Sequence, residues 1–492
     1  MIKNSLLILA IIFTFNAFTS EIFISGMNEF NYILADRITE NRNYFSNKLT
    51  LQVMYRQFRL GLKYDLYRPR FNRFALINKE MTANAIETML KSEKDENFLD
   101  EYYLQYESDH WFIQAGTFEA AIGSGLILHN FYNEDFEEDS RLTGAYFNPV
   151  YDKWQLQLFG GWMKSDDANL EDEYDRLGAV DASFNLSDNL SLSTAYVLHQ
   201  KLLEIDEIDY LNRAVISGRL NFTSDKIDLQ AEYANGKDDN EIESSALYAT
   251  ATGYLGKFTL SSSYKNYENF DVRISDLPMV NHIGQQLAHG WDPGRDEEGF
   301  LGEIKFLPNY DNEFVLNYAE GWSSNYKVRL SNFYAEYKRD FDTFSLKTEF
   351  EMLEQLNEEG ANYWYKEITP ALTLDFMIDK LPVLIKAEYQ YKEIENISAH
   401  NSHFEPRLQS DVSLGNYSLS LAVENQIGDS DAPEDGDDGD FWIGAEIAAA
   451  VLKNTDIRLF YGKEKGGVVC RNGVCKNQSE FSGLRLTIST TF

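Results

Sequence analysis

Apolar and polar side chains alternate along one short segment after another of this chain, with the two-residue period of a β-strand. In the last segment Leu484, Leu486 and Ile488 fall on one face, whereas Arg485 and Thr487 fall on the other. The same alternation runs through residues 227–233, 344–350 and 383–391. Because each segment has one apolar face and one hydrophilic face, the sequence predicts an all-β protein.

Composition favours a membrane barrel over a soluble fold. The 492 residues include 30 Tyr and 33 Phe but only 9 Pro, and the mean hydropathy is nevertheless low. A barrel whose outer face meets lipid and whose inner face meets water is both aromatic and polar. The net charge of −35 argues against nucleic acid as a partner, because phosphates would be repelled.

The lengths of the connections distinguish a barrel from a β-sandwich, because a sandwich would show the same alternation of apolar and polar side chains. Short turns are expected at residues 187–189, 223–225, 255–256, 308–311, 415–416 and 453–455. Longer polar stretches lie between such turns, at residues 133–140, 164–175, 266–297 and 428–440. Short connections at one end and long ones at the other are typical of periplasmic turns and extracellular loops.

These features predict a transmembrane antiparallel up-and-down β-barrel of about 24 strands, within a range of 22 to 26. The strands begin near Ile22 and end at Phe492, so both ends of the barrel are expected in the periplasm. Phe492 ends an alternating strand, as does the C-terminal signal that the barrel assembly machinery reads in outer-membrane proteins. The expected location is therefore the outer membrane of a Gram-negative bacterium, with outer-membrane lipid and lipopolysaccharide as neighbours.

The N-terminus has the layout of a secretory signal peptide. Lys3 precedes an apolar run over residues 6–15, and small residues follow at Ala17, Thr19 and Ser20. We expect a signal peptide over residues 1–20 and a single barrel domain over residues 21–492; an N-terminal membrane anchor is the alternative. No globular plug domain is expected before the strands, so anything that fills the lumen should come from loops. Residues 79–95 have helix-like spacing and could cap the surface or fold inward.

The two cysteines predict a disulfide across a hairpin. Cys470 and Cys475 flank Asn472-Gly473, the preferred pair for a type I′ turn. With this pair at the tip, Cys470 lies opposite Cys475, within disulfide range. The bond would contribute about 2 kcal/mol, because the closed loop is short. A redox or metal site is the alternative, although no histidine lies nearby.

A glycine-rich segment is a candidate constriction loop. Gly116, Gly123, Ser124 and Gly125 allow a sharp bend or a close backbone approach, which a loop folding into the barrel would need. A bulged strand top is the alternative. A phosphate-binding loop is excluded, because the Lys-Ser/Thr ending is absent.

Two further groups of residues bear on metals and catalysis. The stretch 428–440 is crowded with carboxylates and could hold Ca²⁺, although its spacing does not match an EF-hand and such runs are usually solvated. His282 and His289 share a long loop with Trp291 and Asp292, but no nucleophile motif accompanies them. We therefore expect no enzyme activity, no cofactor and no resident metal.

Two of these motifs resemble a family of outer-membrane proteins from Bacteroidota-like bacteria, known only as a domain of unknown function. The first is Gly116-Thr117-Phe118 with residues 123–128, and the second is the tail over residues 466–475 with Gly483 and Phe492. The chain departs from the family pattern at residues 119–122 and at His129, where Arg is expected. The resemblance implies an exported barrel with a loop disulfide and supplies no substrate.

The leading functional hypothesis is a channel for passive passage of small solutes or cations. The expected inward faces carry mixed charges, which a hydrated lumen tolerates; examples are Asp228, Glu232, Lys347, Glu349, Lys386 and Glu388. The alternative is a surface barrel, plugged by its own loops, that acts as a scaffold or assembly component. An outer-membrane hydrolase using His282 or His289 is a third hypothesis.

Overall fold

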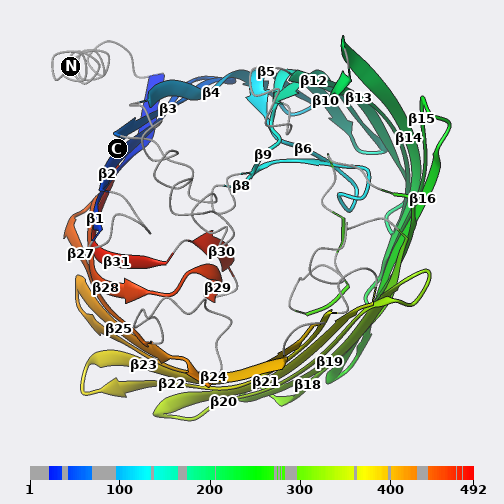
Figure 1. The fold of residues 1–492 in the computed structure, drawn as a ribbon. Coiled ribbons are helices and arrows are strands. Elements are labelled where there is room, and N and C mark those ends of the chain that lie inside the picture. The colour runs from blue at the N-terminus through cyan, green and yellow to red at the C-terminus, as the bar shows by residue number, and fades with distance from the viewer. Residues whose placement is uncertain are drawn as a thin grey trace.

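The alternating segments pair with their neighbours in sequence, and the last strand pairs with the first, so the sheet closes into a barrel (Figure 1). Strand β1 runs antiparallel to β31, with Met27 opposite Thr491 and Ala35 opposite Gly483. The computed structural model describes residues 22–35, 43–68, 96–133, 138–164, 174–205, 207–270, 274, 277–278, 280–282, 296–358, 363–396, 400–428, 441–471, 474–478 and 480–492.

The strands of the barrel wall are mostly 10 to 17 residues long, enough to cross a bilayer at a tilt. They are β1 (Ile22–Ala35), β2 (Tyr44–Tyr55), β3 (Phe58–Arg68), β4 (Glu96–Glu107), β5 (Trp111–Phe118), β10 (Leu142–Tyr151), β11 (Trp154–Lys164), β12 (Tyr174–Ser187), β13 (Leu190–Ile205), β14 (Glu207–Thr223), β15 (Ile227–Asp238), β16 (Glu243–Leu255), β17 (Phe258–Glu268), β18 (Glu297–Asn309), β19 (Asn312–Ser323), β20 (Val328–Asp340), β21 (Phe344–Asn357), β22 (Tyr363–Ile378), β23 (Leu381–Glu395), β24 (His400–Leu414), β25 (Tyr417–Asn425), β26 (Ile427–Gly428), β27 (Phe441–Leu452), β28 (Thr455–Glu464) and β31 (Phe481–Thr491). Six short strands lie outside this sheet: β6 (Ala120–Ile122), β7 (Leu128–Asn130), β8 (Tyr132–Asn133), β9 (Glu138–Asp139), β29 (Gly467–Arg471) and β30 (Val474–Gln478).

The barrel has 24 strands. The sheet contains 25 segments, but β26 continues β25 after a single residue, Gln426, and both pair with β24. Every pairing is antiparallel and joins strands that follow one another around the ring. The predicted up-and-down barrel of about 24 strands is therefore confirmed, and the described residues contain no helix.

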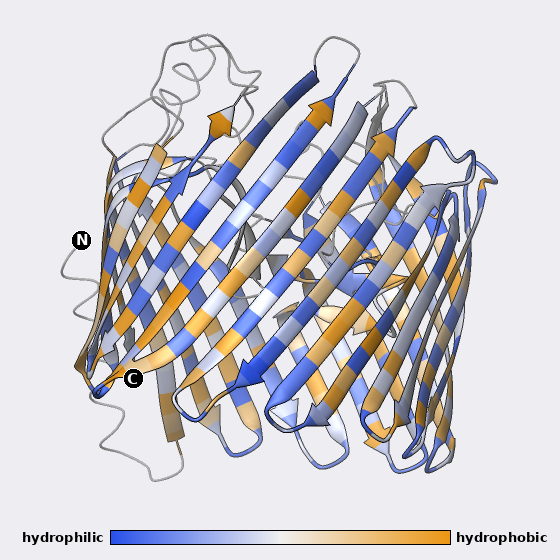
Figure 2. Ribbon diagram, turned by 90° about the horizontal axis from the view of Figure 1, so that it is seen from below, coloured by the Kyte–Doolittle hydropathy of each residue, from blue (hydrophilic) through white to orange (hydrophobic). Residues whose placement is uncertain are grey.

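Short and long connections lie at opposite ends of the barrel (Figure 2). At the turn end, β16 and β17 are joined by Gly256 and Lys257, and β24 and β25 by Gly415 and Asn416. Gly256 and Gly415 have φ values of 64° and 66°, the left-handed region that tight hairpin turns require. The C-terminus also lies at the turn end, as predicted (Figure 2).

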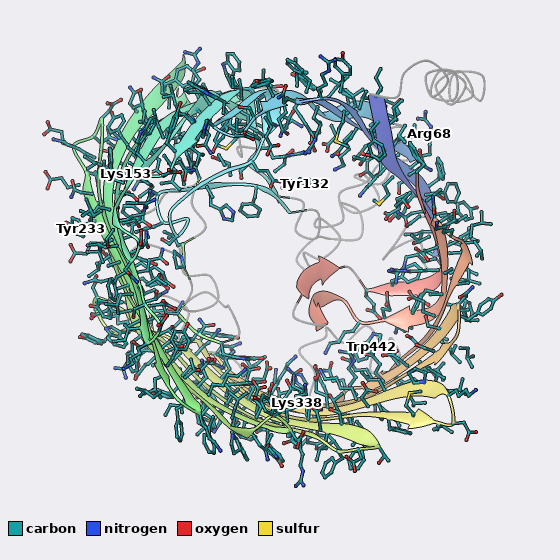
Figure 3. All side chains as sticks on the ribbon, turned by 180° about the vertical axis from the view of Figure 1, so that it is seen from behind. Arg68, Tyr132, Lys153, Tyr233, Lys338 and Trp442 are labelled. Atoms are coloured by element: carbon teal, nitrogen blue, oxygen red, sulfur yellow. The ribbon has the colours of Figure 1, made fainter. Side chains whose placement is uncertain are left out.

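The two faces of the wall differ as the alternation requires, and hydrophobic bands stripe the strands in Figure 2. On β15, Glu232 is fully buried against Ser124 inside the barrel, whereas Tyr233 is 54% exposed and points outward (Figure 3). Outward-facing aromatic rings also gather near the turns. Stacked pairs there are Tyr151–Trp154, Phe258–Phe306, Phe314–Tyr337 and Phe341–Phe344. Such a belt is typical of barrel surfaces at the edge of the hydrocarbon layer.

Three sequence predictions fall outside the described residues: the signal peptide over residues 1–20, the helix-like stretch 79–95 and all but Gly428 of the acidic stretch 428–440. In the part of the chain that the structure describes, no helix is both long and apolar enough to cross a bilayer.

Candidate functional site: the lumen and its infolded segments

Within the residues that the structure describes, parts of three connections lie inside the barrel (Figure 1). The first infolded segment, residues 119–141, carries β6 to β9. The second is described at residues 269–270, 274, 277–278, 280–282 and 296. The third, residues 465–480, carries the β29–β30 hairpin. The lumen and these segments form the candidate site, because any solute crossing the barrel must pass them.

The first infolded segment is held by an apolar cluster inside the barrel. Ile122, Leu126, Ile127 and Leu128 are fully buried in it. The wall contributes inward side chains from β11 to β17, namely Phe159, Met163, Leu177, Ala179, Ala195, Val197, Val215, Ala234, Ala246 and Tyr267. A dry cluster on the inner face of one arc is unusual for a hydrated lumen, and it fixes the segment by burial of apolar area.

A buried polar contact pins the tip of the same segment. The Ser124 backbone N–H and Oγ both donate to Glu232 Oε2, at 3.1 and 2.7 Å. Gly123 lies so close that a Cβ there would stand 2.5 Å from Arg219 Cδ and 2.6 Å from Glu232 Oε2. Arg219 is ion-paired with Asp181, and both side chains are almost completely buried. The φ values of Gly123 and Gly125, 60° and 85°, make this tip a tight turn.

The base of the first infolded segment carries a mixed-charge cluster. Arg141 donates to Asp139 at 2.8 Å and to Asp100 of β4 at 3.2 Å, and Lys63 of β3 pairs with Asp100 at 2.9 Å. The Tyr132 ring, which lies inside the barrel in Figure 3, has Lys63 Nζ 4.3 Å and Arg141 Cζ 4.4 Å from its centroid. Burial raises the pKa of the Tyr132 phenol, so the ring stays neutral between its two cations.

The second infolded segment is tied to the first and to the opposite wall. The His129 N–H donates to the Ile274 carbonyl at 2.7 Å, and Phe270, Ile274 and Leu277 join the apolar cluster. The His282 ring stacks on Tyr334 of β20, with the ring centroids 3.6 Å apart. His282 thus anchors a loop. His289, the other histidine of the hydrolase hypothesis, lies outside the described residues.

The third infolded segment is tethered by ion pairs at its two ends. Lys465 lies 2.6 Å from Glu405 and 3.4 Å from Glu424. Glu480 accepts from the Trp442 indole at 3.0 Å and pairs with Lys463 at 3.0 Å. Trp442 points toward the lumen in Figure 3.

The backbone of this hairpin pairs Cys470 with Cys475 and Arg471 with Val474, the register that the Asn-Gly motif predicts. Cross-strand partners in this register lie within disulfide range. The disulfide itself stays a prediction. We expect a thiol-reactive polyethylene glycol maleimide to label neither cysteine of the purified protein until reductant is added. Cys475→Ser is the control, since it should leave Cys470 reactive without reductant. Labelling of the unreduced wild type would contradict the bond.

The rest of the lumen face is rich in carboxylates. Several of its basic side chains have acidic partners: Lys305–Glu313, Lys347–Glu349, Lys386–Glu388, Lys392–Glu405 and Arg485–Glu464. Other carboxylates are held by neutral donors: Glu29 by Asn31, Glu303 by Asn317, Glu351 by Asn332, Glu367 by Gln390 and Asp411 by Gln409. Acidic groups therefore outnumber basic groups along this arc, and the inward orientation expected for Lys347, Glu349, Lys386 and Glu388 agrees with these contacts.

The structure separates the four residues of the candidate constriction loop. Gly123, Ser124 and Gly125 lie at the tip of the first infolded segment, whereas Gly116 lies in β5, in the wall. A Cβ on Gly116 would stand 2.2 Å from the Tyr102 carbonyl oxygen, so glycine is required there by the close approach of β4. Within the described ranges, no group of three or more His, Cys, Asp or Glu is placed to hold a metal ion.

The sequence predicts one polar loop over residues 266–297 and does not predict the second infolded segment. Phe270, Ile274, Leu277 and Val280 interrupt that stretch at intervals of three or four residues, and all four are buried. This spacing was a usable signal that part of the loop packs against something.

Solved structures with similar folds are outer-membrane barrels. One is the E. coli P pilus tip assembly intermediate PapC-PapD-PapK-PapG, with 9% identity, a TM-score of 0.56, and coverage of 95% of this chain and 60% of that chain. The P pilus usher (PapC) translocation pore has 9% identity, a TM-score of 0.49, and coverage of 95% and 99%. The copper transporter OprC has 8% identity, a TM-score of 0.47, and coverage of 96% and 80%. At 9% identity the likeness to the first of these structures shows the fold alone.

The chain spans 60% of the length of the first of these structures. No curated protein matches the sequence. A family profile does match, over residues 1–360. The resemblance to a domain of unknown function is confirmed to that extent, and the chain belongs to the family of unknown function DUF6029.

Proposed function

We propose that this protein is an outer-membrane channel of porin type, through which small hydrophilic solutes pass passively, with a preference for cations. The observation that carries the proposal is the carboxylate-rich inner face, where several basic side chains are ion-paired while Glu303, Glu351 and Glu367 accept hydrogen bonds from amide side chains. Carboxylates that line an aqueous passage attract cations and repel anions.

The infolded segments divide the lumen in this proposal. The first packs on the apolar arc of β11 to β17, and the second reaches from that arc to Tyr334 of β20. We assign Gly123, Ser124 and Gly125 to the constriction that they form. The passage then runs along the polar arc, from β18 onward around the ring to β3. The outward aromatic belt near the turns supports membrane insertion, because aromatic rings favour the boundary between hydrocarbon and water.

Cation preference can be measured by reversal potentials across planar bilayers in a KCl gradient. We expect the wild type to favour K⁺ over Cl⁻, and the double variant Glu351→Gln, Glu367→Gln to shift the reversal potential toward zero, since it removes two lumen carboxylates. Glu354→Gln is a matched control, because Glu354 lies on the same strand as Glu351 but faces outward, against the Trp364 indole. Its reversal potential should equal that of the wild type.

An absence of conductance from a correctly folded barrel, judged by heat-modifiable gel migration, would overturn the channel proposal. Equal shifts from Glu354→Gln and from the lumen variant would overturn the assignment of selectivity to the lumen carboxylates.

A second candidate is a surface barrel plugged by its own loops that serves as a scaffold. Four fully buried apolar side chains of the first infolded segment favour it, because such a segment does not open readily. A silent wild-type barrel that co-purifies with a stable partner would support the scaffold. Neither candidate includes an enzymatic activity.

A further inference from the structure

We propose that the outward-facing surface of β11 to β14, at the loop end, binds the phosphate of an anionic lipid of the outer leaflet, of the lipid A class. This anionic-lipid site is defined by Trp162, Tyr174, Arg176 and Tyr210, with Lys164 beside them. It rests on the membrane placement proposed above but not on whether the barrel conducts.

Arg176 is the centre of the anionic-lipid site. It is exposed on the outer face of β12, and its guanidinium lies 4.7 Å from the centroid of the Tyr210 ring. Among the described residues no carboxylate lies within ion-pair distance of Arg176. Its neighbour Asp175 faces inward, where it accepts from His199 and from the Leu202 backbone N–H. A guanidinium stacked on one face keeps its in-plane donors available for a phosphate.

The surroundings of Arg176 fit the headgroup region of a membrane. Trp162 is the cross-strand partner of Arg176, and Tyr174 is the partner of Lys164, so two rings and two basic groups share one face. Trp162 and Tyr174 are 54% and 47% exposed. Tryptophan and tyrosine concentrate where hydrocarbon meets headgroups, and basic side chains at that height bind anionic lipid heads.

The surface below the anionic-lipid site is apolar. Following the same strands toward the turns, the outward residues include Leu158, Val180, Leu198 and Ile216, all well exposed. A molecule that contacts both the anionic-lipid site and this apolar surface carries an anionic head and an apolar tail. This continuity favours a lipid over a soluble phosphate compound, because only the lipid gains from the apolar surface.

The outer rim elsewhere has the opposite charge. On β18, β19, β21 and β23 the outward residues near the loops are carboxylates that accept from neutral aromatic donors: Glu298 from Tyr264, Glu320 from Tyr318, Glu354 from Trp364 and Glu393 from Tyr391. In a chain of net charge −35, the sector around Arg176 differs from this acidic part of the rim, because Arg176 shares its face with a second basic group, Lys164, whereas Arg329 of β20 donates through Nε to the Tyr326 carbonyl.

Native mass spectrometry of the purified barrel titrated with lipid A tests the inference. We expect the barrel to bind bisphosphorylated lipid A about tenfold more tightly than dephosphorylated lipid A. One charge-assisted hydrogen bond to a phosphate accounts for a difference in affinity of that size. Arg176→Gln should abolish that difference, and Arg176→Lys should restore part of it. Arg329→Gln is the matched control, because Arg329 is also outward and near the loops, but on the acidic side of the rim. It should behave as the wild type.

Equal retention by the wild type and Arg176→Gln would overturn the site, as would equal retention of the two lipids by the wild type. Inorganic phosphate that binds the barrel as tightly as lipid A would overturn the assignment to a lipid. Arg176→Gln should keep heat-modifiable migration and the wild-type conductance. A loss of lipid preference with conductance intact therefore separates this inference from the channel proposal.

Discussion

Replacing residues 120–139 with a short Gly-Ser linker is expected to raise the single-channel conductance several-fold. This stretch carries most of the first infolded segment, which occupies the lumen beside β11 to β17. In the proposed channel, its removal exposes the apolar inner face of β11 to β17 and enlarges the open cross-section, on which conductance depends. Planar bilayer recordings of the refolded variant, compared with the wild type, provide the measurement.

A point substitution tests the role of the first infolded segment without shortening the chain. Leu126→Asp places a carboxylate in the apolar cluster, which offers it no hydrogen-bond donor or cation. Because burying an unpaired charge is costly, the segment should detach from the wall, and the conductance should become larger and noisier. Ala121→Asp adds the same charge on the same segment at an exposed position and should leave the conductance unchanged.

The deletion also separates the two candidate functions. If the wild type conducts no current and the deletion variant does, the native barrel is plugged. A conducting wild type whose conductance stays unchanged after the deletion would show that the first infolded segment is not the constriction.

Arg219→Leu is expected to lower the free energy of unfolding by about 3 to 5 kcal/mol. Arg219 is ion-paired with Asp181 on the inner wall, and both side chains are buried under the first infolded segment. Removing the guanidinium leaves the Asp181 carboxylate buried without its counter-ion. Denaturant unfolding in detergent micelles, followed by heat-modifiable migration, measures the loss.

Two controls separate this effect from a general loss of charge. The double variant Arg219→Leu, Asp181→Leu should recover part of the stability, because the Asp181 carboxylate is removed while the buried carboxylate of Glu232, the cross-strand partner of Arg219, remains. Lys347→Leu breaks an ion pair with Glu349 at a half-exposed site and should cost at most about 1 kcal/mol. A loss of similar size from Arg219→Leu and Lys347→Leu would contradict burial as the cause.

Local pattern was enough to predict the pairing of the strands. In an up-and-down barrel each strand pairs with its neighbour in sequence, so the order follows once the segments are recognised. The Asn472-Gly473 turn likewise set the register of Cys470 against Cys475, because a two-residue turn leaves one pairing available. The sequence does not predict the aromatic belt, since the height of a ring on the barrel depends on the register of each strand against the next.

By itself, the sequence predicted the alternation of apolar and hydrophilic faces along the strands and the division into short turns and long loops, because both depend on neighbours a few residues apart. The tertiary structure decided what fills the barrel. Leu126 joins the apolar cluster that contains Phe159 and Val215, Ser124 bonds Glu232, and His282 stacks on Tyr334, only after the sheet has closed. No periodicity along the chain encodes contacts between segments so far apart.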